Sequence, residues 1–174
     1  MSQDASQEQR AGRNYRAAAE DEMLSALKHE TVVRTASYKE DTGGMDAPRN
    51  SAPSLAAGAF GKYASAVAAE RGMSPVALMG RVGVPDARDA LPSEEEVAQR
   101  LQEEAEAAYT AERSASGGHV PRSCVASKLQ SAADKFARMV ALDKAPAEAS
   151  TAAPQPESAQ QMAEKAPAEQ HQQE

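Results

Sequence analysis

The sequence predicts an all-α fold of small helical hairpins, with extensive disordered tails at both ends. Two observations predict it. Apolar residues recur every three or four positions in several segments, and no segment alternates apolar and polar residues over the length of a strand. Alanine and glutamate, which are both frequent, favour helices and are depleted in strands. Periodicity and composition therefore agree on helices and predict no sheet.

The segment with the clearest pattern, residues 91–144, is expected to form a helical hairpin. Ser93 followed three residues later by Glu96 matches the capping box that starts a helix. Gly117 and Gly118 are expected to end that helix, because glycine adopts the left-handed conformation that closes helices. The largest apolar side chains on the two helical stripes should form the hairpin core: Leu101, Tyr109, Val125, Leu129 and Phe136.

The flanking segments carry weaker signals. Residues 1–16 are polar and are expected to form a disordered N-terminal tail. Residues 17–90 form a possible diverged first helical unit, with helices expected at 17–35, 53–71 and 74–79. Residues 145–174 consist mainly of Ala, Pro, Gln, Ser and Glu without periodicity. Because their prolines prevent a continuous helix, they should be a disordered acidic tail.

Two Gly-Gly pairs suggest an internal repeat. Gly43-Gly44 and Gly117-Gly118 each follow a charged helical segment and precede a segment rich in Ser and Ala. The repeat would make residues 17–90 a copy of residues 91–144. Since the match is short and the chain is rich in alanine, chance similarity is the alternative explanation.

The second half of the hairpin also carries a family motif. A helix rich in Ala and Glu is followed by Gly-Gly and then by Val-Ala-Ser-x-x-Gln-Ser-Ala-Ala-Asp. This order resembles the seed maturation protein domain of the late embryogenesis abundant proteins, in a diverged form. The matching residues are Gly117, Gly118, Val125, Ala126, Ser127, Gln130, Ser131, Ala132, Ala133 and Asp134. Members of that family are protectants that accumulate during drying, so the resemblance implies a protectant and not an enzyme.

The composition excludes several classes of protein. Hydrophobic residues make up 41% of the chain, but many are alanine and aromatic residues are only 3%, so helices form more easily than a core. A net charge of −7 argues against a nucleic-acid partner. No apolar run is long enough for an integral membrane segment, and the N-terminus lacks the apolar centre of a secretory signal. We therefore expect a cytoplasmic or nuclear protein.

No group of residues predicts a catalytic, cofactor or metal site. The three histidines lie far apart, without the spacing of metal ligands. The lone cysteine, Cys124, is expected to be a small residue on a helix face and not a nucleophile. The glutamates of residues 94–104 are typical of a solvated helix face. We expect neither enzymatic activity nor a cofactor.

Two functions remain from the sequence. The first is a stress or desiccation protectant that shields client proteins as water is lost. The alternative is a small helical adaptor that binds a helical partner protein through the hairpin of residues 91–142. A large rise in helix content on drying or in trifluoroethanol favours the protectant, whereas a stable, cooperatively melting helix in dilute buffer favours the adaptor.

Overall fold

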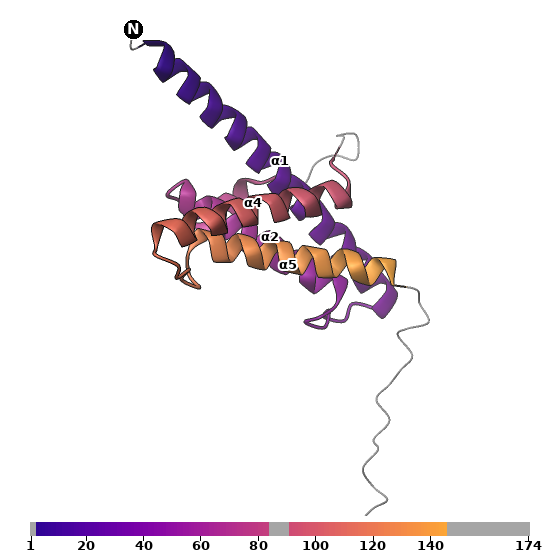
Figure 1. Cartoon of the computed structure of the whole chain (residues 1–174). Helices are drawn as coiled ribbons and strands as arrows, with labels where there is room; N and C mark the ends of the chain where they lie inside the picture. The colour runs from indigo at the N-terminus through magenta and orange to yellow at the C-terminus, as the bar shows by residue number, and fades with distance from the viewer. Residues whose placement is uncertain (1–2, 84–90, 146–174) are drawn as a thin grey trace, which may run out of the picture. The chain divides into compact units, whose positions relative to one another are not determined.

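A computed structural model describes residues 3–83 and 91–145. Over these residues the regular structure is helical and no strand occurs, which confirms the all-α prediction (Figure 1). The helices are, in chain order, α1 (Gln3–Thr42), α2 (Ala52–Glu70), α3 (Pro75–Arg81), α4 (Glu94–Ala115) and α5 (Val125–Lys144). None of the described helices is long and apolar enough to span a membrane.

The first helix is longer than the sequence pattern predicts. α1 begins at Gln3, so residues 3–16, expected in the N-terminal tail, are helical. It also continues seven residues beyond the predicted end at residue 35, to Thr42. The reason is that no proline interrupts this stretch, and helix-forming Ala, Gln, Glu and Arg dominate its beginning. The stop is Gly43, whose φ of 67° is the left-handed conformation that closes a helix.

The local start and stop signals lie where the sequence placed them. Ser93 accepts a hydrogen bond from the backbone N–H of Glu96, and the Glu96 side chain accepts one from the backbone N–H of Ser93. This is the complete capping box. Ser74 caps α3 by accepting from the backbone N–H of Ala77. After α4, Gly117 and Gly118 have φ angles of 66° and 102°.

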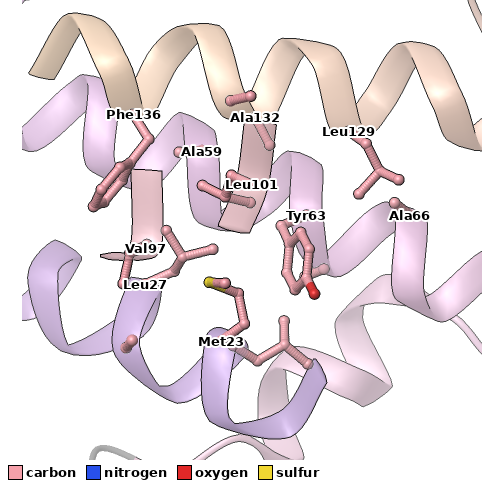
Figure 2. Packing of buried hydrophobic residues seen from close by; sticks show 14 of the residues in the cluster. Met23, Leu27, Ala59, Tyr63, Ala66, Val97, Leu101, Leu129, Ala132 and Phe136 are labelled. Atoms are coloured by element: carbon pink, nitrogen blue, oxygen red, sulfur yellow. The ribbon is translucent and has the colours of Figure 1, made fainter. Parts of the chain in front are cut away.

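One hydrophobic core joins the described helices. It draws buried side chains from each of α1 to α5, and Figure 2 shows those from α1, α2, α4 and α5 meeting. α2 packs against α1, α3 and α5, and α5 packs more extensively against α2 than against α4. The hairpin of α4 and α5 is therefore not a separate unit, because α5 packs on α2 as well as on α4. Whether residues 17–90 and 91–144 are repeats stays a hypothesis.

The expected hairpin core is buried at three of its five positions. Leu101, Leu129 and Phe136 are at most 2% exposed, and Val125 is partly buried against the core. The expectation for Tyr109 is wrong, since its side chain is 40% exposed. Three successive steps of four residues from Val97 turn Tyr109 by about 120° around the helix axis, away from the buried face. Ala108, which returns to that face, packs there instead.

The chain divides into residues 1–144 and residues 145–174. The first part is the helical unit described above. The predicted acidic tail, residues 145–174, lies outside the described residues except for Ala145.

Candidate functional site

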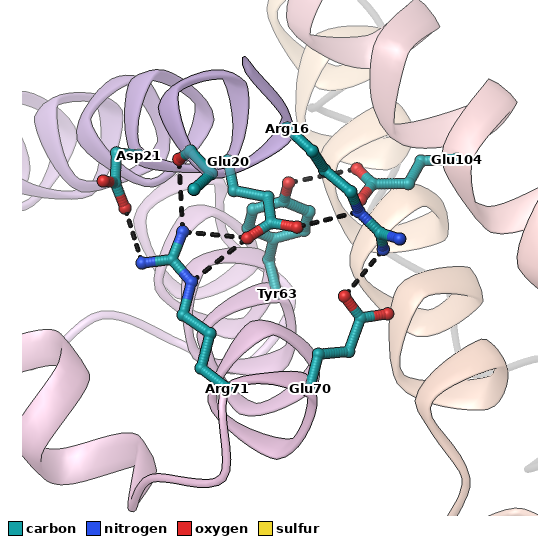
Figure 3. Close-up of polar contacts among 8 residues, drawn as sticks. Arg16, Glu20, Asp21, Tyr63, Glu70, Arg71 and Glu104 are labelled. Carbon is teal, nitrogen blue, oxygen red and sulfur yellow. Dashed lines mark hydrogen bonds and ion pairs between the residues drawn. The ribbon is translucent and has the colours of Figure 1, made fainter. Parts of the chain in front are cut away.

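A cluster of charged and polar side chains lies where α1 crosses the C-terminal end of α2. We call it the Glu20 cluster, and Figure 3 shows it. Glu20 is the one buried charged residue of the described side chains, at 7% exposure. Its two carboxylate oxygens bind different arginines: Oε1 lies 3.0 Å from Nε of Arg16, and Oε2 lies 2.8 Å from Nη2 of Arg71. A buried carboxylate is thus neutralised from two sides.

Arg71 holds this cluster to the end of α2. It is the C-cap residue of that helix, where a positive charge also suits the helix dipole. Its Nε and Nη2 both donate to Glu20 Oε2, at 3.1 and 2.8 Å, and its Nη1 binds Asp21 at 2.8 Å. Burial alone would lower the pKa of Arg71, but the hydrogen bonds to Glu20 and Asp21 raise it above its ordinary value. Arg71 is therefore fixed as a structural cation.

A phenol and a carboxylate form the inner edge of the Glu20 cluster. The hydroxyl of Tyr63 donates to Oε2 of Glu104 at 3.0 Å. Burial raises the pKa of Tyr63, and the neighbouring charge of Glu104 raises it further. Burial also raises the pKa of Glu104, although the hydrogen bond from Tyr63 opposes the shift. Both groups already have partners, so the pair binds two helices together and offers no free base or nucleophile.

A hollow of about 430 Å³ adjoins this pair, between α1 and α4. Carboxylates and arginines line it, among them Glu22 and Arg100, whose side chains pair at 2.7 Å. Each lining carboxylate already accepts a hydrogen bond from an arginine, from Tyr63 or from Gln99, so the hollow lacks the unpaired convergent groups of a ligand site.

A second arginine cluster lies farther along α1. Arg34 binds Glu30 at 3.2 Å on its own helix, Glu94 at 2.6 Å in the first turn of α4, and Asp143 at 2.6 Å in the last turn of α5. Burial raises the pKa of Glu94, and the charge of Arg34 opposes that shift. One guanidinium thus ties three helices together. We call this group the Arg34 cluster.

The family-motif residues serve the turn and the packing of α5. Gly117 and Gly118 form the turn after α4, and Ala126, Ala132 and Ala133 are buried. Val125 is partly buried against the core. The polar members lie outside the core: Ser127 donates to the backbone oxygen of Pro121 at 2.8 Å, Gln130 donates to Asp134 at 3.1 Å, and Ser131 is partly exposed. The alanines let α5 approach α2 closely, and the motif assembles no reactive group.

The other candidate residues also have structural surroundings. Cys124 lies just before α5, where its sulfur accepts from the backbone N–H of Ser127 at 3.4 Å, as an N-cap residue does. His29 has a buried Nδ1 without a hydrogen-bond partner, 3.7 Å from Glu30. Among the described residues, no three His, Cys, Asp or Glu side chains are grouped so that they would hold a metal ion.

Sequence reasoning missed both arginine clusters. The pairs within α1, Arg16 with Glu20 and Glu30 with Arg34, have the i, i+4 spacing and are readable from the sequence. Their partners on other helices lie 50 or more residues away, and only the packing of the helices brings them together.

Comparison with known protein families, curated proteins and solved structures finds no match. The resemblance to the seed maturation protein domain therefore rests on the motif residues alone.

Proposed function

We propose that the chain is a stress or desiccation protectant of the late embryogenesis abundant type, which shields client proteins from one another as water is lost. The observation that carries the proposal is the composition of the core. Nearly half of the buried apolar residues are alanine, and Tyr63 and Phe136 are the buried aromatic residues among those described. A helical bundle with this core depends strongly on the amount of water around it.

The physical argument starts from apolar area. A buried alanine removes much less apolar surface from water than leucine or phenylalanine, so the hydrophobic contribution to this fold is small. Backbone hydrogen bonds and ion pairs make up a correspondingly large share. Both kinds of interaction compete with water in dilute solution and strengthen when water is removed. The bundle should therefore become more stable on drying, when most proteins lose stability.

The charge of the chain supports the same function. A net charge of −7 keeps copies of the chain apart as their concentration rises. Glutamates outnumber arginines on the exposed face of α4, where Glu95, Glu96, Glu103 and Glu106 lie. A layer of such chains between client proteins would separate their surfaces. We place this action in the cytoplasm or the nucleus.

The alternative, an adaptor that docks through the hairpin of residues 91–142, has less support. Both apolar stripes of the hairpin already pack in the core, against α2 and against each other. What the hairpin leaves exposed is two separated large side chains, Tyr109 at 40% and Leu142 at 49%. A helix-in-groove partner needs a continuous apolar face.

The test is the recovery of a labile client enzyme after drying and rehydration. The chain should preserve more activity than an equal mass of a folded, acidic protein of similar size, and its own melting temperature should rise with added sucrose. Equal recovery with the control protein would overturn the proposal. The adaptor would instead give the client no more protection than the control protein does.

A further inference from the structure

α1 is attached to the rest of the bundle by a short apolar contact. Over residues 12–42, where its side chains are described, the buried apolar residues are Met23, Leu24, Ala26 and Leu27. They occupy little more than one turn of a 40-residue helix. Figure 2 shows Met23 and Leu27 directed toward Tyr63, Val97 and Leu101. The apolar attachment of α1 is therefore local.

Ion pairs flank this apolar contact on both sides. Toward the N-terminus, Arg16 binds Glu70 at 2.7 Å. Glu20 and Asp21 both bind Arg71. Toward the C-terminus, Arg34 binds Glu94 on α4 and Asp143 on α5. Between them, Glu22 pairs with Arg100, and Lys28 donates to the backbone oxygens of Met79 and Val82. Charge thus fixes α1 at several points along its length.

The other helices are joined differently. Among the described residues, the ion pairs between helices involve α1, with the exception of Lys144 and Glu95, which link α5 to α4 at 2.9 Å. The contacts of α5 with α2 and α4 are otherwise made by buried apolar residues such as Leu129, Ala132 and Phe136. The core that joins α2, α4 and α5 is apolar, whereas α1 joins it through one short apolar contact and takes part in most of the ion pairs between helices.

We propose that α1 is a strap whose attachment is controlled by ionic strength: salt releases it and uncovers the apolar face of Tyr63, Val97 and Leu101. Several of its pairs are open to solvent, with side-chain exposures of 62% for Arg16 and 45% for Arg100. Such pairs are screened by dissolved ions, whereas apolar contacts are not. Gly43 and Gly44, which join α1 to the loop before α2, allow the helix to swing away.

Release of α1 would expose apolar side chains that are now buried. Tyr63, Val97 and Leu101 are at most 2% exposed when α1 is in place. Their exposure would create an apolar surface on a chain that otherwise presents charge. This behaviour goes beyond the proposed protection of clients, because it occurs in dilute solution and requires no client.

The experiment measures the distance between α1 and α4 by pulsed electron resonance. Spin labels are placed at Ser37 and Gln102, both exposed, in a chain carrying Cys124→Ser. Raising NaCl from roughly 0.05 M to 1 M shortens the screening length to about 3 Å. We expect one narrow distance distribution at low salt and a longer, broader one at high salt. Helix content should fall by no more than the share of α1. Sucrose, which carries no charge, should leave the distance unchanged.

Variants separate charge from general damage to the fold. Arg34→Gln combined with Arg71→Gln should release α1 at about a twofold lower NaCl concentration than the parent. Arg113→Gln, which removes an exposed arginine from α4, should not change the salt midpoint. Glu22→Arg should lower the midpoint, and adding Arg100→Glu should restore it by re-forming the pair in reverse.

The outcomes decide the proposal. A distance distribution that is the same at low and high NaCl overturns it, and so does a double arginine variant with the midpoint of the parent. Should the double variant lose its helices altogether, the salt series on the parent chain and the Glu22–Arg100 exchange still decide. A failure of α1 to release leaves the protectant proposal standing, because the drying assay measures that function separately.

Discussion

The hydroxyl of Tyr63 donates a hydrogen bond to Glu104 at 3.0 Å and so joins α2 to α4 in the middle of the helical unit. The Tyr63 side chain is 1% exposed, so its hydroxyl has little access to water. A buried hydroxyl without a partner is costly, and a carboxylate is a strong acceptor. The hydrogen bond to Glu104 therefore allows the Tyr63 hydroxyl to be buried in the core without the cost of an unpaired polar group.

Replacing Tyr63 with Phe should lower the free energy of unfolding by about 1–2 kcal/mol, because the ring stays while Glu104 loses its donor. The loss in the free energy of unfolding stays in this range because Glu104 is only partly buried and water can replace part of the lost hydrogen bond. Chemical denaturation measures the change, and a double-mutant cycle with Glu104→Ala, which removes the acceptor, isolates the pair. The control is Tyr109→Phe, at a 40% exposed position, which should be nearly neutral. Equal losses for the two tyrosines would show that the hydrogen bond contributes nothing.

Glu104→Gln should stabilise the protein at neutral pH. Burial raises the pKa of Glu104 above its ordinary 4.5, so the folded state binds the proton more tightly than the unfolded state does. The ionised form therefore costs stability above the folded-state pKa, and this cost disappears as the pH falls toward 4.5. The variant should melt at a higher temperature than the parent at pH 7, and the two melting temperatures should converge in acid. A difference that widens below pH 5 would contradict the assignment.

The features that the sequence predicted correctly depend on neighbouring residues. The capping box of Ser93 and Glu96 and the turn at Gly117 and Gly118 are set within four residues, so local chemistry suffices. Helix type followed from periodicity in the same way. The early start of α1 was missed because a polar segment can be helical without a core pattern.

The features that were missed depend on how helices pack. Tyr109 was predicted to be buried as a large apolar side chain at helical spacing, but a position twelve residues after Val97 has turned off the buried face. Glu20 and Arg71 are 51 residues apart in the chain, and nothing near either residue indicates the other. The packing of α2 on α5 was missed for the same reason, since nothing in either segment indicates that the two helices meet.

Gly61→Ala should raise the free energy of unfolding by about 1 kcal/mol. Glycine in a helix interior costs about that much relative to alanine, and a Cβ at Gly61 would meet no atom within 4 Å. Gly58→Ala is the matched comparison on the same helix. A Cβ there would come within 3.0 Å of Cδ of Lys135, so that side chain must move and the gain should be smaller. Denaturation midpoints rank the two variants, and a larger gain at Gly58 would contradict the close approach of α5.

Ser93→Ala should cost about 1 kcal/mol, because it removes the side chain that caps the first turn of α4. Ser74→Ala removes the same kind of cap from the seven-residue α3, whose buried residue is Leu78, and should cost less. Thermal melts of both variants measure the losses. The capping interpretation fails if Ser93→Ala melts like the parent while Ser74→Ala does not.

Leu129→Ala tests the hairpin core and the proposed function together. Leu129 is 2% exposed on α5 and belongs to the core shared with α2 (Figure 2). Buried Leu→Ala replacements cost about 2–5 kcal/mol, and we expect the low end because alanine-rich surroundings offer the side chain fewer contacts. A fold with little apolar burial has little stability to lose, so the variant should have lower helix content in dilute buffer.

The response of Leu129→Ala to drying tests whether the folded helical bundle is needed for protection of the client enzyme. If water loss consolidates the helices, sucrose should restore much of the helix content lost by Leu129→Ala, and protection of a dried client enzyme should recover in parallel. Leu142→Ala is the control on the same helix, because Leu142 is 49% exposed and its loss should change neither quantity. Should Leu129→Ala leave both helix content and client protection at the level of the parent, the hairpin core is not the element that acts during drying.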